Sequence, residues 1–319
     1  MARAQIEIVV DNGVRLLSAA LAASNWPEEE QAVHRHRAHL HARQTSDRVK
    51  PYAGHLAVRQ LEALMAKGYT LDDLYGYALD LTDPGLEPRG TYPVAFDGWN
   101  AALRDFAEAA DLPSWWAENE APWQAACEQA GQIIGRAPVV ALLDAFCGTV
   151  PERLCFMPNV SYPSEKQICV LSGDTLLCVV PPPVAWGDNE PWPFDDDAVY
   201  VLRCAFAEYA RVLMLRYVRE AQSNGELAVA WDETLLRLFV AGAVAVFLEQ
   251  AVSPRESGAY VLMERRVNGL IALPEAVEQL KLYLAAREAG HSRHFLEYLP
   301  QFSAFVESAA GMAESPGAL

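Results

Sequence analysis

Two kinds of hydrophobic pattern alternate along the chain. In the first and last thirds, apolar residues recur every three or four positions, which is typical of amphipathic helices. Pro and acidic residues near helix starts, and Gly near helix ends, add boundary signals. The pattern predicts helices over residues 13–23, from 27 onward, 53–68, 71–81, 97–111, 113–134, 139–148, 198–219, 232–251, 256–271, 273–288 and 293–309.

The middle of the chain has a strand-like pattern instead. The segments RLCFMPNVSYP (153–163) and KQICVLSGDTLLCVVPPP (166–183) are rich in β-formers, and Ser172-Gly173-Asp174 between two apolar runs predicts a hairpin turn. We therefore predict an α+β fold that is mostly helical, with a small, mainly antiparallel sheet packed on a helix bundle. We expect a helical part over 1–150, a sheet-plus-helix part over 151–310 that continues the same domain, and a disordered tail over 311–319.

Composition narrows the possible partners. The chain has 319 residues and a formal net charge of −17, which argues against binding to nucleic acid or to an anionic membrane surface. Glu7, Asp11 and Arg15 interrupt any secretory signal pattern, and the uncharged apolar run 238–248 is too short to span a bilayer. We therefore expect a cytoplasmic protein with no nucleic-acid and no membrane partner.

The chain contains two sets of residues of types that bind metals, a run of histidines and six cysteines. The histidines of HRHRAHLHARQ, if helical, fall on two opposite faces, and the arginines between them would repel a cation. We expect an exposed polar helix here rather than a metal site. The cysteines show no C-x-x-C spacing, which favours buried reduced thiols over a metal cluster. These residues are His34, His36, His39, His41, Cys127, Cys147, Cys155, Cys169, Cys178 and Cys204.

A charged pair lies inside the apolar stretch LRCAFAEYARVLM (202–214). Glu208 precedes Arg211 by three residues, a spacing at which two side chains of one helix form an ion pair. The same stretch can be aligned with the zinc-peptidase motif H-E-x-x-H, in which the Glu activates a zinc-bound water. Glu208 then occupies the general-base position, and Ala207 and Arg211 occupy the positions of the two zinc-binding histidines.

Four further segments of the sequence contribute to a resemblance, and their order along the chain is part of it. They are VDNGVRLLSAALAASNWPEE, VKPYAGHLAVRQL, LLDAFCGTVPERLCFMPNVSYP and LKLYLAAREAGHSRHFLEYLPQFSAF. Together with the 207–211 segment, they resemble a family of uncharacterised bacterial zinc peptidases that carry H-E-x-x-H. The resemblance implies a zincin-like fold of the gluzincin type. It also implies a site containing Glu208, His55 and Glu233, with Glu233 as the third metal ligand from the following helix.

The motif departs from this family at both histidine positions. Ala207 has no donor atom, and the guanidinium of Arg211 stays protonated and offers no lone pair. We therefore expect a catalytically inactive, metal-free relative without a cofactor, which binds an unknown peptide, protein or small ligand in the residual cleft. An edge strand within 167–181 could pair with an extended peptide. Arg211 would replace zinc as the counter-charge of Glu208 and Glu233, so its loss would cost about 3–5 kcal/mol.

Other interpretations remain open at this stage. The chain could be an active peptidase with non-standard ligands, or a structural or interaction protein unrelated to peptidases. His55 could be a packed, hydrogen-bonded residue, and His291 and His294 are expected at the surface. The acids Asp195–Asp197 are explained by helix capping rather than by calcium binding. No G-x-S-x-G, Walker A or dinucleotide-binding fingerprint occurs in the sequence.

Overall fold

The chain divides into two compact units that interleave in sequence. The computed structural model describes residues 5–26, 39–161, 166–183, 189–227, 231–291 and 294–313. The first unit comprises 1–135 and 152–201, and the second comprises 136–151 and 202–319. The short segment 136–151 groups with the C-terminal helices, and 152–201 groups with the N-terminal helices. The α+β, mostly helical class predicted from the sequence is confirmed.

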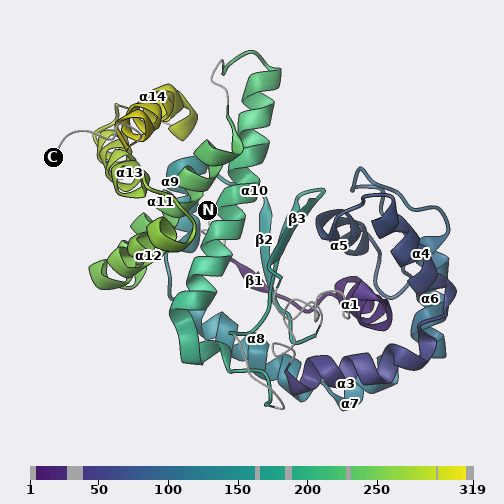
Figure 1. The fold of residues 1–319 in the computed structure, drawn as a ribbon. Helices are drawn as coiled ribbons and strands as arrows, with labels where there is room; N and C mark the ends of the chain where they lie inside the picture. The colour runs from purple at the N-terminus through teal and green to yellow at the C-terminus, as the bar shows by residue number, and fades with distance from the viewer. Residues whose placement is uncertain are drawn as a thin grey trace. The chain divides into compact units, whose positions relative to one another are not determined.

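The first unit combines a four-stranded sheet with several helices (Figure 1). Its strands are β1 (Glu7–Ile8), β2 (Arg153–Pro158), β3 (Ile168–Ser172) and β4 (Thr175–Val180). Its helices are α1 (Asn12–Ala23), α3 (Leu40–Val49), α4 (Leu56–Ala66), α5 (Leu71–Leu79), α6 (Trp99–Ala109), α7 (Leu112–Glu118) and α8 (Ala121–Ile134), with 3-10 turns at Lys50–Tyr52 and Phe194–Asp197.

The sheet is mixed, with strand order β1-β2-β4-β3. β3 and β4 form the predicted antiparallel hairpin, in which Ser172 lies opposite Thr175. β1 pairs parallel to β2, and β2 pairs parallel to β4. The expectation of a mainly antiparallel sheet is therefore wrong, because the N-terminal strand and the long crossovers add parallel pairs that local sequence patterns do not show. β1 and β3 are the two edge strands of the described sheet, and peptide pairing along β3 stays a prediction.

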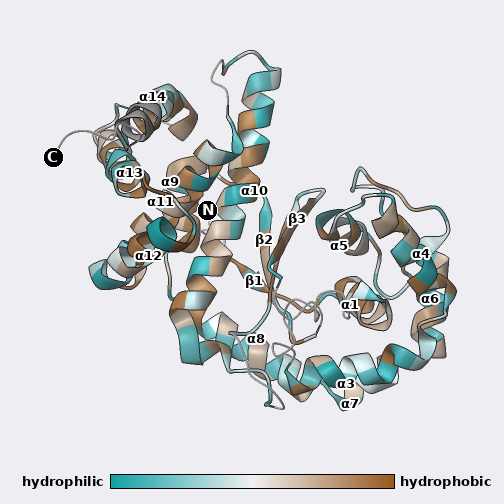
Figure 2. Ribbon diagram, in the orientation of Figure 1, coloured by the Kyte–Doolittle hydropathy of each residue, from teal (hydrophilic) through white to brown (hydrophobic). Residues whose placement is uncertain are grey.

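Helix α1 forms the centre of the helical part of this unit. It packs against α3, α4, α5 and α6, which surround it in Figure 1. Its sequence is almost entirely apolar and small, whereas α3 is largely polar (Figure 2). Gly13 allows the close approach to α5, since a Cβ atom there would lie 2.4 Å from the carbonyl oxygen of Ala78. The Trp99 Nε1 atom donates to the carbonyl of Ala57 (3.0 Å), which joins α6 to α4.

A buried carboxylate organises the loop that follows α5. Asp80 is 2% exposed and accepts hydrogen bonds from the backbone nitrogens of Gly90 (2.8 Å), Thr91 (2.9 Å) and Tyr92 (3.2 Å). The hydroxyl groups of Thr91 and of Ser172 on β3 also donate to Asp80. A single side chain therefore connects the end of α5, the loop and the edge strand.

The second unit is helical. It contains α9 (Val139–Cys147), α10 (Ala198–Ser223, which belongs to this unit from Leu202), α11 (Glu233–Ala251), α12 (Pro254–Val267), α13 (Leu273–Glu288) and α14 (Phe295–Ala313). α11 packs against α12 and α13. An aromatic cluster formed by Phe146, Phe239, Tyr283 and Phe295 joins α9, α11, α13 and α14. These side chains are almost fully buried and form the core of this unit.

Most predicted helices form, but the one expected from residue 27 onward begins outside the described residues, and two others differ from expectation. The segment expected as one helix over 113–134 contains two, α7 and α8, which are separated near Asn119. α14 continues to Ala313, so residues 311–313 of the expected disordered tail are helical, and 314–319 lie outside the described residues. α11 is 19 residues long and, by length and composition, could cross a membrane, although only its 238–248 run was recognised in the sequence. In this structure, 61% of the apolar stretch of α11 is buried against the rest of the protein, as in a core helix.

Candidate functional site

Helix α10 presents the motif positions on its less buried face. Phe206, Tyr209 and Ala210 are at most 1% exposed, whereas Ala207, Glu208 and Arg211 are partly accessible. Positions 207 and 211 are one helical turn apart, so their side chains lie on the same side of the helix. The structure thus places three of the predicted site residues together.

Glu208 and Arg211 form an ion pair within α10. The Arg211 Nε and Nη2 atoms donate to Glu208 Oε2 at 3.0 and 2.7 Å. The Glu208 side chain is 16% exposed and the Arg211 side chain is 33% exposed. This geometry places a cation on the carboxylate that occupies the general-base position of the motif. It also matches the simpler interpretation of an i,i+3 pair.

Glu233 does not join this group. It is an exposed residue in the first turn of α11, where Asp232 caps the helix by accepting from the backbone nitrogen of Leu235 (2.8 Å). The ring centres of Phe206 and Phe247 lie 4.4 Å apart in a stacked arrangement. The motif on α10 therefore lies beside the C-terminal end of α11. Phe247 follows Glu233 by 14 positions in α11. At about 1.5 Å per residue, Glu233 is roughly 20 Å away along the helix, so it does not share a bridging Arg211 with Glu208.

We expect the Arg211→Met variant to lose only about 1 kcal/mol of folding free energy. The partly exposed pair can be rehydrated when the cation is removed, so the loss should be smaller than the 3–5 kcal/mol expected for two buried carboxylates. Urea unfolding followed by circular dichroism measures this difference. Arg216→Met is the matched control, because Arg216 pairs with Glu220 on the same helix (2.8 Å). A loss above 3 kcal/mol for Arg211→Met but not for Arg216→Met would contradict this prediction. It would instead support the hypothesis that Arg211 is the counter-charge of two buried carboxylates.

His55 lies in the first unit, where it caps α4. Its Nδ1 atom accepts from the backbone nitrogen of Ala57 (3.2 Å), and its Nε2 atom lies 3.1 Å from the carboxylate of Asp105. Because Nδ1 accepts, the hydrogen-bond network assigns the proton to Nε2, which donates to Asp105. The ring also contacts Phe106. These contacts give His55 a structural role in capping and packing.

The histidine run differs from the expected exposed helix. His34 and His36 lie outside the described residues, but His39 and His41 are only 1% and 2% exposed. His39 is the N-cap of α3 and accepts from the backbone nitrogen of Ala42 (3.1 Å). His41 stacks on Trp115 at 5.8 Å. The expectation was wrong because capping and a tryptophan-rich neighbour bury these rings, and helical angles do not apply to a residue that precedes its helix.

Burial keeps both of these imidazoles neutral. Desolvation, with smaller contributions from His41 and Arg43, lowers the pKa of His39 to about 3. Desolvation and the nearby Arg15 lower the pKa of His41 to about 4. Among the described residues, no three His, Cys, Asp or Glu side chains are arranged to hold a metal ion. The six cysteines are free thiols, and all except Cys127 are buried.

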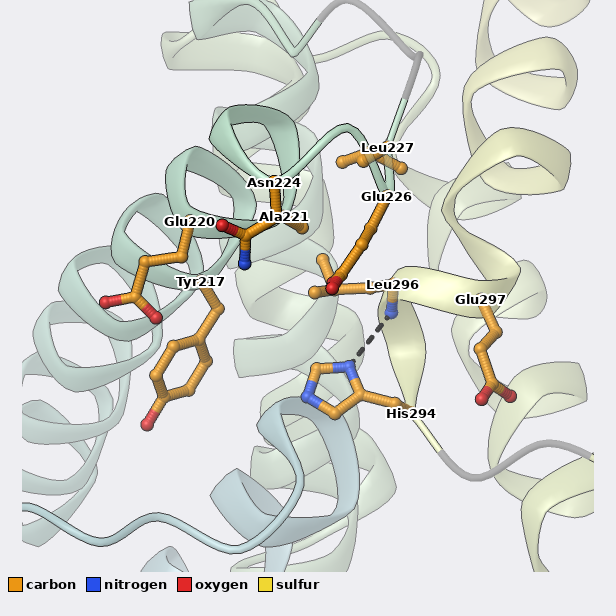
Figure 3. A pocket seen from close by; sticks show the side chains of 9 residues that line it. All are labelled: Tyr217, Glu220, Ala221, Asn224, Glu226, Leu227, His294, Leu296 and Glu297. Carbon is orange, nitrogen blue, oxygen red and sulfur yellow. Dashed lines mark hydrogen bonds between the residues drawn. The ribbon is translucent and has the colours of Figure 1, made fainter.

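The second unit has a cavity of about 440 Å³ where the C-terminal end of α10 approaches the start of α14 (Figure 3). Tyr217, Glu220, Glu226 and His294 are among its lining residues. The His294 ring is already engaged, since Nδ1 accepts from the backbone nitrogen of Leu296 (3.2 Å) and Nε2 contacts the carbonyl of Cys147. Glu220 accepts from Arg216. The cavity therefore has acidic walls, and the side chains of His294 and Glu220 already make hydrogen bonds within the protein.

His294 was expected at the surface, but it is half-buried and connects α14 to the end of α9. Gly148 makes room for it: its φ is +76°, and a Cβ atom there would lie 2.7 Å from the His294 ring. The phrase Phe-Cys-Gly at 146–148 is a local signal for this turn, but its histidine partner is distant in sequence.

Comparison with known proteins finds no matching family model, no significantly similar curated protein and no significantly similar solved structure.

Proposed function

We propose that this protein is a catalytically inactive, metallopeptidase-like protein that acts by binding rather than by hydrolysis. The observation that carries the proposal is the Glu208–Arg211 ion pair on the partly accessible face of α10. In a zinc peptidase of this kind, the carboxylate at position 208 would activate a metal-bound water, and positions 207 and 211 would supply two imidazoles. Here one position is alanine and the other holds a cation on the carboxylate.

The surroundings of this pair support a lost site over an active one. The arginine cannot coordinate a metal, and its positive charge disfavours a divalent cation beside Glu208. Glu233 is displaced along α11, so the third ligand implied by the resemblance is missing from this position. Among the residues that the structure describes, no set of ligands around Glu208 matches peptidase chemistry.

The first test is the metal content of the full-length protein, purified without an affinity tag or chelator. We expect zinc well below one atom per chain by elemental analysis, and no hydrolysis of a quenched fluorescent peptide library with added zinc. Stoichiometric zinc, or hydrolysis that a chelator abolishes, would overturn the proposal in favour of an active peptidase with other ligands.

A second test asks whether α10 retains the geometry of a zinc helix. The double variant Ala207→His with Arg211→His places two imidazoles one turn apart beside Glu208. We expect it to bind zinc with a dissociation constant in roughly the micromolar range, since only two imidazoles contribute. The control is Arg211→His alone, which removes the same cation but supplies only one imidazole beside Glu208. Zinc binding by the double variant that is no tighter than that of the control would show that α10 lacks this geometry, and would favour an interaction protein unrelated to peptidases.

A further inference from the structure

The first unit contains a cavity of about 480 Å³ that is separate from α10 and its motif. Its walls come from α1, the loop after α5, α6 and α7. Most of the lining is apolar, with Leu16, Pro84, Leu86, Ala107 and Trp116 among the contributing residues. A volume of this size fits a small organic molecule, and mostly apolar walls with few polar groups are typical of ligand sites. We call this space the Arg15 cavity, after the cation that lines it.

Arg15 is held in an unusual environment at this cavity. The residue is only 9% exposed, and its guanidinium carbon lies 4.5 Å from the ring centre of Trp116 and 4.7 Å from that of Trp123. Among the described residues, its buried Nε and Nη2 atoms have no hydrogen-bond partner. Burial lowers the pKa of Arg15 to about 10, with Glu120 opposing this effect, so the side chain remains a cation at neutral pH.

An arginine this buried normally pairs with a carboxylate, because a buried charge without hydrogen bonds is costly. Cation–π contact with two indole rings offsets part of that cost but leaves the in-plane N–H groups unsatisfied. The Nε–Nη2 edge is the side of a guanidinium that matches the two oxygens of a carboxylate. A planar anion in the cavity would satisfy this edge once the groups that now cover it shift aside, because Arg15 lines the cavity but its Nε and Nη2 atoms are buried in this structure.

The other charged groups at the cavity restrict the kind of anion. Asp83, Glu108 and Glu120 are exposed acids at its rim, and Asp83 accepts from Asn12 Nδ2 (2.9 Å). The second cation, Arg104, is already bound to Glu87 (2.6 Å). Among the described lining residues, this arrangement leaves the positive charge of Arg15 without an ion-pair partner inside an acidic rim. A phosphate or a polyanion would be repelled by the rim, whereas a singly charged carboxylate would expose little charge to it.

We propose that the Arg15 cavity binds a small organic monocarboxylate, with the carboxylate on Arg15 and an apolar body against Trp116 and the neighbouring aliphatic walls. This site does not depend on the function proposed for α10. Binding would supply the missing hydrogen bonds of Arg15 and remove apolar ligand surface from water. The acid is defined by its chemistry, namely one carboxylate joined to a compact apolar group.

The test uses phenylacetate and heptanoate as probes, with phenylacetamide and heptanamide as uncharged analogues of the same shape. Isothermal titration calorimetry and thermal shift are measured on the full-length protein. We expect at least one acid to bind and to raise Tm, and its amide to bind roughly 10- to 100-fold more weakly. Inorganic phosphate should bind more weakly than the acid. Equal binding of acid and amide, stronger phosphate binding, or no binding of either acid at millimolar concentration would each overturn the proposal.

Variants of Arg15 separate a ligand-binding residue from a structural one. Arg15→Met should lose acid binding by roughly 10-fold or more while keeping or raising the Tm of the free protein, because it removes an unpaired buried charge. Arg15→Lys keeps the charge without the two-pronged edge and should also weaken binding. Arg153→Met is the control: Arg153 pairs with Glu7 outside the cavity, so binding should be unchanged. Acid binding that survives both Arg15 substitutions would overturn the assignment.

Discussion

Replacing Asp80 by alanine is expected to lower the free energy of unfolding by about 3–5 kcal/mol. The carboxylate accepts three backbone N–H groups and two hydroxyl groups, from Gly90, Thr91, Tyr92 and Ser172. Burial alone would raise the pKa of Asp80, but these hydrogen bonds together lower it, so the group is ionised in the folded protein. Alanine would leave all of these donors without their charged acceptor.

Urea unfolding at pH 7 measures this effect. Asp105→Ala is the control, because Asp105 is an exposed acid of the same unit whose side chain is 76% accessible. We expect the control to change stability by less than about 1 kcal/mol. Asp80→Asn should fall between the two, since an amide can accept from some of the same donors but presents its own NH₂ group to the others. Equal stability of Asp80→Ala and the control would show that the loop does not depend on this carboxylate.

The second large effect is a loss of stability in mild acid that originates at His39 and His41. Their folded-state pKa values of about 3 and about 4 lie below the usual histidine value of about 6.5. Below pH 6.5 the unfolded chain therefore binds protons that the folded chain does not, and the folded state loses stability as the pH falls. As the pH falls from about 6.5 to the folded-state pKa, each imidazole lowers the unfolding free energy by up to roughly 1.4 kcal/mol per pH unit.

The variant His41→Phe isolates this effect, because a phenyl ring can still pack against Trp115 and Trp123 but cannot be protonated. We expect its unfolding free energy to fall less steeply than that of the wild type between pH 6.5 and 5. His39→Asn retains a capping oxygen for α3, and its unfolding free energy should also fall less steeply than that of the wild type between pH 6.5 and 5. His291→Asn, at an exposed position, is the control. Parallel pH profiles for wild type and His41→Phe would contradict the assignment.

The predicted site residues show which relations a sequence can reveal. Glu208 and Arg211 are three positions apart on one helix, so their contact follows from helical geometry alone. The position of Glu233 depends on how far α11 is shifted against α10, which the Phe206–Phe247 stack defines. The resemblance to the peptidase family placed Glu233 near the motif, whereas the number of residues between Arg211 and Glu233 contains no information on that shift.

Arg15 was not recognised as a site residue for a related reason. In the sequence it is one charge in an apolar segment, and it counted only as an interruption of a possible secretory signal. Its significance depends on Trp116 and Trp123, which are about 100 residues away and belong to α7 and α8. A lone arginine among small apolar residues was the available signal, but a snorkelling surface side chain would give the same pattern.

The sequence by itself determined the helical pattern, the β3–β4 hairpin and the charged pair of α10. Each of these depends on residues within a few positions of one another, where backbone periodicity, capping and turn chemistry act directly. Only the tertiary structure decided the parallel pairing of β1 with β2, the burial of His39 and His41, and the aromatic enclosure of Arg15. These features arise from contacts between distant segments, whose relative placement depends on the packing of whole elements and not on any local pattern.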